Sequence, residues 1–75
     1  DWKPHIAIDA DTLAGKPRVA GTRISVEQVL SHLGNGWTIE QLLDQYPTLT
    51  RDGILACIAF AAVYLGSERM VSLRG

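Results

Sequence analysis

A chain of 75 residues with a net charge of −1 contains one small domain, whose core is too small to be very stable by itself. The single cysteine excludes an internal disulfide, and one cysteine with two histidines excludes a structural zinc site. The acidic balance excludes a protein that coats nucleic acid or anionic membranes by bulk charge, so any basic function is expected to be local. No stretch has the pattern of a signal peptide, and we expect a cytoplasmic protein.

The N-terminal third predicts a β-hairpin over residues 5–24. In HIAID, residues 5–9, the alternation places Ile6 and Ile8 on one half-buried face of a strand. The later RVAGTRISV is rich in β-branched residues, and Gly21 inside it indicates a bulge or a close backbone approach.

Capping signals predict three helices that begin near residues 26, 39 and 51. Ser25 with Gln28, and Thr38 with Gln41, match the capping box, and Thr50 is expected to cap the third helix. These helices form a predicted core over 25–66, followed by a C-terminal tail over 67–75.

The helix ends are marked as well. Glycines at 34 and 36 close the first helix, and Pro47 ends the second. The inner face of the second helix is expected to be Ile39, Leu42, Leu43 and Tyr46. The short connection YPTLT has the length found in helix-turn-helix units.

The third helix carries no charge between Ile54 and Leu65, yet it is too short to cross a membrane. We expect one face to pack on the first two helices: Ile54, Leu55, Ile58, Ala62 and Leu65. We expect another face to bind a partner, either in a homodimer or in a tight hetero-complex: Ala56, Phe60, Val63 and Tyr64.

No catalytic or nucleotide-binding arrangement is found. Gly15 and Lys16 match part of a phosphate-binding loop, but Ala10 replaces its first glycine and Pro17 its magnesium-binding hydroxyl. Cys57 is expected to be a buried hydrophobic residue, and His32, beside an apolar stripe, to be solvated. We therefore expect no enzyme, cofactor, metal or small-molecule substrate.

The basic residues are clustered. Lys16, Arg18 and Arg23 lie in a window without acidic residues and can contact the phosphates of double-stranded DNA. Alternatively they only solubilise the hairpin, with Arg23 bonded to main-chain carbonyls. Arg51 begins the third helix and can also reach a duplex, although beyond Asp52 that helix offers almost no polar side chain to read bases.

Three segments together, GKPRVAGTRISV, GWTIEQLLDQYPTLT and ILACIAFAA, resemble a family of small bacterial and archaeal proteins, domain of unknown function 433. The resemblance runs from about Ile6 to Tyr64, and Gly53 departs from it where an acidic or amide residue is expected. It implies a mainly α fold, with a homeodomain-like helix-turn-helix core behind a hairpin.

The resemblance also implies a role as the antitoxin of a type II toxin-antitoxin pair. Such antitoxins dimerise, bind their own promoter and block a toxin that resembles a PIN-type nuclease. Two hypotheses stay open: a dimeric antitoxin that binds DNA, and a protein-interaction module of helix-turn-helix shape without nucleic-acid binding.

Overall fold

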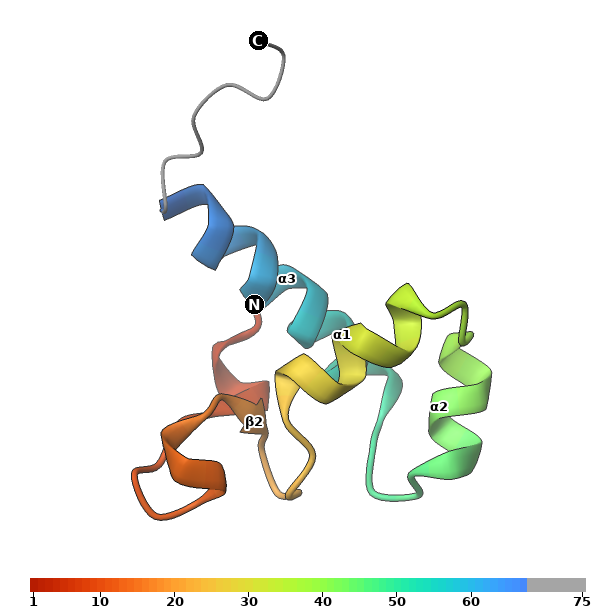
Figure 1. Cartoon of the computed structure of the whole chain (residues 1–75), viewed down its shortest axis with the longest axis horizontal. Helices are drawn as coiled ribbons and strands as arrows, with labels where there is room; N and C mark the ends of the chain where they lie inside the picture. Colours follow the sequence, from red (N-terminus) through yellow and green to blue (C-terminus); the bar gives the residue numbers. More distant parts are fainter. Residues whose placement is uncertain (68–75) are drawn as a thin grey trace, which may run out of the picture.

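Three α-helices follow a small N-terminal hairpin in the computed structural model, which describes residues 1–67 (Figure 1). The elements in chain order are η1 (Lys3–His5), β1 (Ile6–Ala7), η2 (Leu13–Gly15), β2 (Arg18–Val19), α1 (Val26–Gly34), α2 (Ile39–Gln45) and α3 (Arg51–Ser67). The mainly α fold with an N-terminal hairpin is as predicted, and the three helices begin at the predicted residues. The predicted tail lies outside the described residues, apart from Ser67, which is the last residue of α3.

The hairpin is shorter than predicted. Strands β1 and β2 pair antiparallel, with Ile6 opposite Val19 and Ala7 opposite Arg18. The prediction that Ile8 shares a half-buried face with Ile6 is wrong, because Ile8 lies beyond the strand and is 59% exposed.

The segment after β2 folds back on β2 and does not continue the strand. Arg18 forms a bridge with Ser25, and the Val19 N–H donates to the Ile24 carbonyl at 2.9 Å. Gly21 has a φ of +81° in the turn between them, and nothing lies within 4 Å of a Cβ built on it. Gly21 therefore serves a turn that needs a left-handed residue, and the alternative of a close backbone approach is wrong.

The helix caps agree largely with the sequence. The Thr38 hydroxyl accepts from the Gln41 N–H at 3.1 Å, and the Gln41 side chain accepts from the Thr38 N–H at 2.8 Å, which completes the capping box. Thr50 accepts from the Gly53 N–H at 3.0 Å. The box predicted at Ser25 is only half formed: Ser25 caps the helix, but the Gln28 side chain donates to the hydroxyl of Tyr46.

Gly53 marks a close approach between α3 and the hairpin. A Cβ at this position would lie 3.1 Å from Cγ1 of Val19 and 3.2 Å from Oγ1 of Thr50. A Cβ here would require the side chain of Val19 or Thr50 to shift by a few tenths of an ångström, and glycine avoids this contact.

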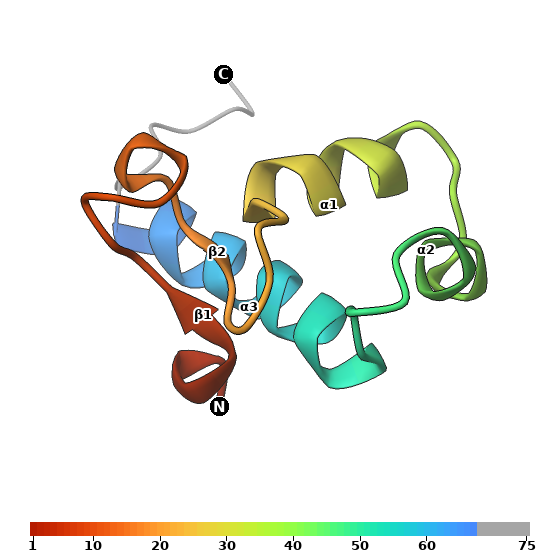
Figure 2. The ribbon, with the colours of Figure 1, turned by 90° about the horizontal axis from the view of Figure 1, so that it is seen from below.

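Helix α3 is the centre of the domain and contacts η1, both strands, α1 and α2. The hairpin and α2 lie at opposite ends of the domain, with α3 passing both (Figure 2). The buried core is Val19, Val26, Val29, Leu42, Leu49, Ile54 and Cys57. The inner face predicted for α2 is confirmed, since Leu42 is fully buried and its three companions pack against the core.

The faces predicted for α3 are partly wrong. Leu55 and Ile58, expected to be inside, are 46% and 44% exposed, whereas Ala56, expected to face a partner, is 4% exposed. The prediction considered only α1 and α2 as neighbours of this helix. Because η1 and β1 cover a further flank of α3, the buried face is rotated toward Ala56, Cys57 and Phe60.

Candidate functional site

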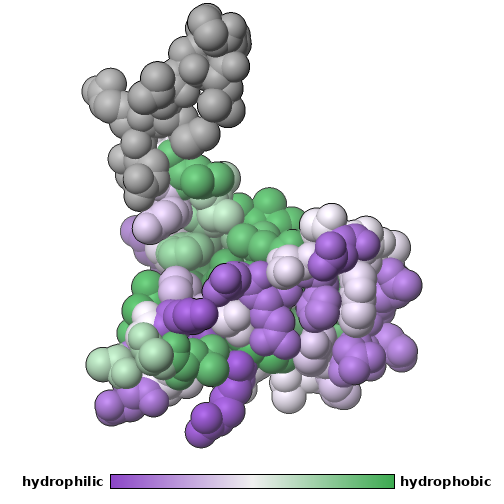
Figure 3. All heavy atoms as spheres, in the orientation of Figure 1, coloured by the Kyte–Doolittle hydropathy of each residue, from purple (hydrophilic) through white to green (hydrophobic). Residues whose placement is uncertain are grey.

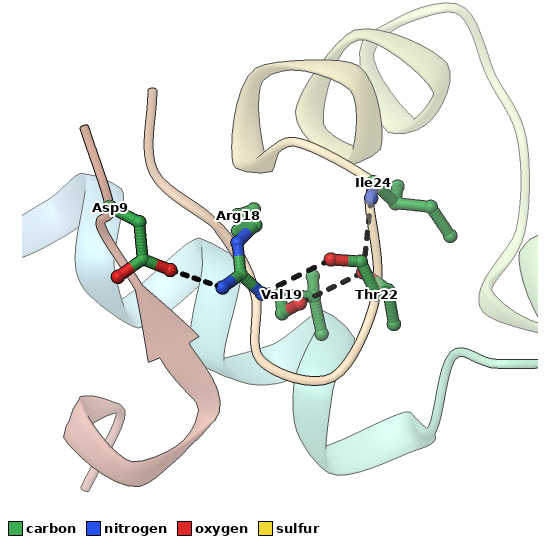
Figure 4. A network of polar contacts seen from close by, with 5 residues as sticks. All are labelled: Asp9, Arg18, Val19, Thr22 and Ile24. Carbon is green, nitrogen blue, oxygen red and sulfur yellow. Dashed lines mark hydrogen bonds and ion pairs between the residues drawn. The ribbon is translucent and has the colours of Figure 1, made fainter. Parts of the chain in front are cut away.

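Arg18, predicted to contact DNA, is engaged inside the hairpin (Figure 4). Its guanidinium forms an ion pair with the carboxylate of Asp9 and donates to the Thr22 carbonyl at 3.2 Å. The side chain is only 16% exposed. The sequence offers a bond to main-chain carbonyls as an alternative role for Arg23. In the structure it is Arg18 that bonds to a main-chain carbonyl, that of Thr22.

Thr22 completes this network. Its hydroxyl donates to the Val19 carbonyl at 2.8 Å and accepts from the Ile24 N–H at 3.0 Å. The turn between β2 and α1 is thus held by one guanidinium and one hydroxyl, both of which bond to main-chain groups. Arg18 is a structural residue of the hairpin.

The other predicted basic residues are more exposed. Lys16 lies 3.2 Å from Glu27, and Arg51 lies 3.6 Å from Glu40, with all four side chains at least 60% exposed. Exposed pairs of this kind contribute little stability. The basic window is therefore largely neutralised by Asp9 and Glu27 from outside it, a pairing that the sequence order does not show.

Arg23 is exposed and makes no ion pair within residues 1–67. A recess of about 390 Å³ brings it together with Arg18 and with three threonines: Thr12, Thr22 and Thr48. Neither Lys16 nor Arg51 lines this recess. Of the four predicted DNA contacts, this recess brings together only Arg18 and Arg23.

A larger, apolar groove of about 950 Å³ lies between the hairpin loop, α1 and the C-terminal half of α3. Its apolar walls are formed by Ile8, Pro17, Val26, Leu30, Phe60, Ala61, Tyr64 and Leu65. Lys16, Glu27 and Ser31 provide polar groups at the same groove. Apolar walls with a few polar groups are typical of a binding site.

Local contacts fix the shape of this groove. The Val26 N–H donates to the Pro17 carbonyl at 3.0 Å, which ties the hairpin loop to the start of α1. Along the other wall, the rings of Trp2 and Phe60 meet edge to face at 4.9 Å, and those of Phe60 and Tyr64 stack at 6.2 Å. Three aromatic rings therefore form a row that extends along α3.

The exposed apolar surface is concentrated on α3. Among residues 1–67, six large hydrophobic side chains are exposed, and all except Ile8 are on this helix: Leu55, Ile58, Val63, Tyr64 and Leu65. Hydrophobic residues gather over α3 in the space-filling view, and hydrophilic residues cover the side of α1 and α2 (Figure 3). Contiguous exposed apolar surface of this kind is typical of interaction sites.

The predicted interface residues divide among three environments. Phe60 and Tyr64 line the groove, Val63 is 55% exposed, and Ala56 is buried beneath the N-terminal segment. Sequence reasoning placed Leu65 in the core, although it lines the groove. The uncharged run over 54–65 indicates that several faces of α3 are apolar. It does not indicate which residues are buried in the core and which line the groove.

His32, predicted to be solvated, belongs to a polar cluster between α1 and α2. Its Nε2 lies 3.0 Å from the Tyr46 hydroxyl, which also accepts from the Gln28 side chain at 3.1 Å. The imidazole stacks on the ring of Trp37 with centroids 4.2 Å apart. The cluster joins the end of α2 to α1 and has a structural role.

Cys57 is fully buried, as predicted, and burial raises the pKa of its thiol to about 11. Thiolate is the reactive form of cysteine, so this residue is unreactive near neutral pH. Within residues 1–67, no group of three or more His, Cys, Asp or Glu side chains is placed to hold a metal ion. No helix in this part of the chain is long and apolar enough to cross a membrane.

The fold and these surfaces define a small, mainly α domain with an N-terminal hairpin and an exposed apolar helix. The chain belongs to the family described as "Protein of unknown function (DUF433)", whose sequence model matches residues 6–61. Among curated proteins, none matches the chain.

A structural comparison gives the same family. The chain is similar to the crystal structure of a DUF433 member protein from Anabaena variabilis, with a TM-score of 0.77 and 25% sequence identity. The match covers 84% of this chain and 62% of that protein. The chain therefore spans less than two thirds of the length of this relative.

Proposed function

We propose that this protein is a non-enzymatic binding domain of the antitoxin type, which holds an apolar segment of a partner protein in the groove beside α3. The observation that carries the proposal is the concentration of exposed large hydrophobic side chains on α3. Exposed apolar surface of this extent is costly in water and is typical of a protein-binding site.

The groove suits a helix or an extended apolar segment. Its walls come from the hairpin loop, α1 and α3, and they are mostly apolar. The Lys16–Glu27 pair adds one positive and one negative side chain to the groove. A partner segment with an amphipathic pattern buries its apolar face against Phe60 and Leu65 and keeps polar groups near this pair. The family resemblance implies a nuclease toxin as the source of that segment.

Leu65→Lys tests this function, with Leu55→Lys as its matched control. Both leucines are about half exposed on α3, at 51% and 46%, but only Leu65 lines the groove. The chain is co-expressed with the product of the adjacent reading frame, and the complex is measured by size-exclusion chromatography with light scattering. We expect Leu65→Lys to weaken the complex about tenfold or more, because burying Leu65 contributes about 1–2 kcal/mol and a buried lysine opposes binding.

The control retains the complex if the groove is the binding site. The absence of a complex, or equal weakening by both variants, would contradict the proposal. If the partner cleaves RNA, inhibition of that cleavage by the native chain and its loss with Leu65→Lys add a functional readout.

DNA binding is the second candidate, and the recess around Arg23 is the observation that favours it. The guanidinium of Arg23 and the hydroxyls of Thr12 and Thr48 can donate to a phosphate, from the hairpin and from the connection between α2 and α3. Arg18 and the Thr22 hydroxyl line the same recess but are already bonded within the hairpin. Acidic residues oppose DNA binding, since Glu40, Asp44 and Asp52 lie on α2 and at the start of α3.

A mobility-shift assay on the upstream region, with a salt series, tests this second function. Arg23→Ala is expected to weaken any shift and to flatten its salt dependence, while Lys3→Ala, which removes a basic side chain remote from the recess in sequence, serves as control. No shift at low salt would remove DNA binding and leave the protein-binding function intact.

A further inference from the structure

The sequence contains a single asparagine, Asn35, and a glycine follows it. In an Asn-Gly dipeptide the main-chain nitrogen of the glycine can attack the side-chain amide of the asparagine, because glycine has no side chain to shield this nitrogen. The attack closes a succinimide ring and releases ammonia. Water then opens the ring at either of its two carbonyls, which leaves aspartate or isoaspartate in place of the asparagine.

The structure places this dipeptide in the connection between α1 and α2 (Figure 1). Asn35 and Gly36 are both exposed, and the side chain of Asn35 makes no hydrogen bond to another described residue. Gly36 has a φ of +95°, and nothing lies within 4 Å of a Cβ built on it. The side-chain amide therefore has room to rotate toward the Gly36 nitrogen, and water has access to the ring.

One hydrogen bond restrains the attacking nitrogen. The Gly36 N–H donates to the Leu33 carbonyl at 3.0 Å, in the last turn of α1. A single main-chain bond of this kind has a small net effect on stability, and helix ends fray. The bond can therefore open while the rest of the domain stays folded, so the fold slows the attack at Asn35 without preventing it.

Asp52 and Gly53 form a second dipeptide of the same kind, in which an aspartate can form the same succinimide with loss of water. Gly53 is buried in the first turn of α3, and its N–H donates to Oγ1 of Thr50 at 3.0 Å. A Cβ on Gly53 would lie 3.1 Å from Cγ1 of Val19. Attack by this nitrogen requires the start of α3 to separate from its cap and from the hairpin, so the fold protects this site.

We propose that Asn35 is a site of spontaneous deamidation in the folded protein, and that its conversion to isoaspartate loosens the joint between α1 and α2. A bond forms between the Gly36 nitrogen and Cγ of Asn35, and the bond between Cγ and Nδ2 breaks. The proton of the Gly36 nitrogen leaves with the ammonia. This inference is independent of the proposed function, because it involves neither the groove nor a partner.

The product differs from asparagine in two ways that act on this joint. Its carboxylate lies at the C-terminus of α1, where the helix dipole disfavours a negative charge. Isoaspartate also carries the main chain through its side-chain carbons, which adds one CH₂ group between residues 35 and 36. This addition displaces Trp37, whose N–H donates to the His32 carbonyl at 3.0 Å and whose ring stacks on His32 with centroids 4.2 Å apart.

An Asp52→Asn variant tests the site with a matched control, because it places the same Asn-Gly dipeptide at both positions of one chain. Asp52 is exposed, so the variant is expected to fold, which circular dichroism checks. The variant is incubated under native conditions and, in parallel, in denaturant. Trypsin cleaves after Arg23 and Arg51 and puts the two positions on separate peptides, on which mass spectrometry measures the exchange of NH₂ for OH.

We expect both positions to convert at similar rates in denaturant. In the folded variant, position 35 should convert only about 2- to 10-fold more slowly than in denaturant, because one hydrogen bond has to open. Position 52 should be slowed about a hundredfold or more, because a buried turn has to unfold. In the native chain, Asn35→Gln should abolish the conversion, since the longer side chain would have to close a larger and less favourable ring.

The effect on the joint is measured on the converted protein. Deamidated chains carry one more negative charge and separate from the native chain by anion exchange, and an isoaspartyl methyltransferase identifies the isoaspartate form. Asn35→Asp reproduces the charge without the added CH₂ group. We expect Asn35→Asp to lower the melting temperature by roughly 2–6 °C, and the isoaspartate form to melt lower still.

Each outcome decides the proposal. Conversion at position 35 but not at position 52 of the folded variant supports it, together with an isoaspartate form that melts below Asn35→Asp. If position 35 stays unconverted in the folded variant while it converts in denaturant, or if both positions convert equally in the folded variant, the site is overturned. An isoaspartate form that melts with the native chain overturns the loosening of the joint.

Discussion

Replacing Arg18 with alanine separates a structural role for this residue from a role in nucleic-acid binding. The substitution removes the ion pair with Asp9 and leaves the Thr22 carbonyl without its charged donor. A hydrogen bond from a charged group contributes about 1.5–3 kcal/mol, and a pair with a half-exposed carboxylate adds about 0.5 kcal/mol. We therefore expect Arg18→Ala to lower the free energy of unfolding by about 2–3 kcal/mol.

The effect is large for a domain of this size. A loss of 2–3 kcal/mol lowers the melting temperature by roughly 10–20 °C in a domain of fewer than 100 residues. Thermal and urea denaturation followed by far-ultraviolet circular dichroism measure it. Asp9→Asn, which removes one charge and keeps a hydrogen-bond acceptor, should cost about 0.5–1 kcal/mol.

Arg23→Ala is the matched control, since Arg23 belongs to the same turn and is exposed. A substitution at such a position changes stability by about 0.5 kcal/mol at most. If Arg18→Ala melts at the same temperature as Arg23→Ala, the network does not hold the turn and our structural reading of Arg18 is refuted.

Three further measurements probe the caps, the packing and the core. Thr38→Ala removes the complete capping box of α2 and should cost about 1 kcal/mol in urea denaturation; no change would show that the box is not formed in solution. Gly53→Ala should be less stable than Gly34→Ala by about 1 kcal/mol, because both variants gain helix propensity but only the Cβ at position 53 meets Val19. The opposite order would contradict the close approach. Burial raises the pKa of the Cys57 thiol from 9.0 to about 11, so the unfolded chain loses this proton at a lower pH than the folded chain. The free energy of unfolding therefore falls as pH rises between these two values. Cys57→Ala should lack that part of the decline, and identical pH profiles for the two proteins would argue against a buried thiol.

The sequence by itself determined the local structure. The Thr38–Gln41 box, the cap at Thr50 and the glycines at the end of α1 act through neighbours a few residues away, so they can be recognised from the sequence alone. The helix starts and the mainly α fold were predictable for that reason. The uncharged run of α3 likewise showed that this helix must be covered on more than one face.

Long-range pairing was not readable in the same way. Arg18 looked like a free basic residue because its partner, Asp9, lies nine positions earlier, and only the antiparallel hairpin brings the two together. Lys16 and Glu27 meet through the same folding of the hairpin onto α1. Two of the three positive charges that suggested DNA binding are thus paired by contacts that the sequence spacing does not show, and Arg23 is left without an ion pair among residues 1–67.

Only the tertiary structure decided which faces of α3 are inside. A helix that is apolar all round has no periodic signal to orient it, and the packing of η1 and β1 on one flank makes the choice. That packing buries Ala56, turns Leu55 and Ile58 outward and leaves Tyr64 and Leu65 beside the groove. The choice of the buried face also decides which apolar residues of α3 stay exposed. In a helix that is apolar on every side, burying one face leaves the apolar residues of the other faces at the surface.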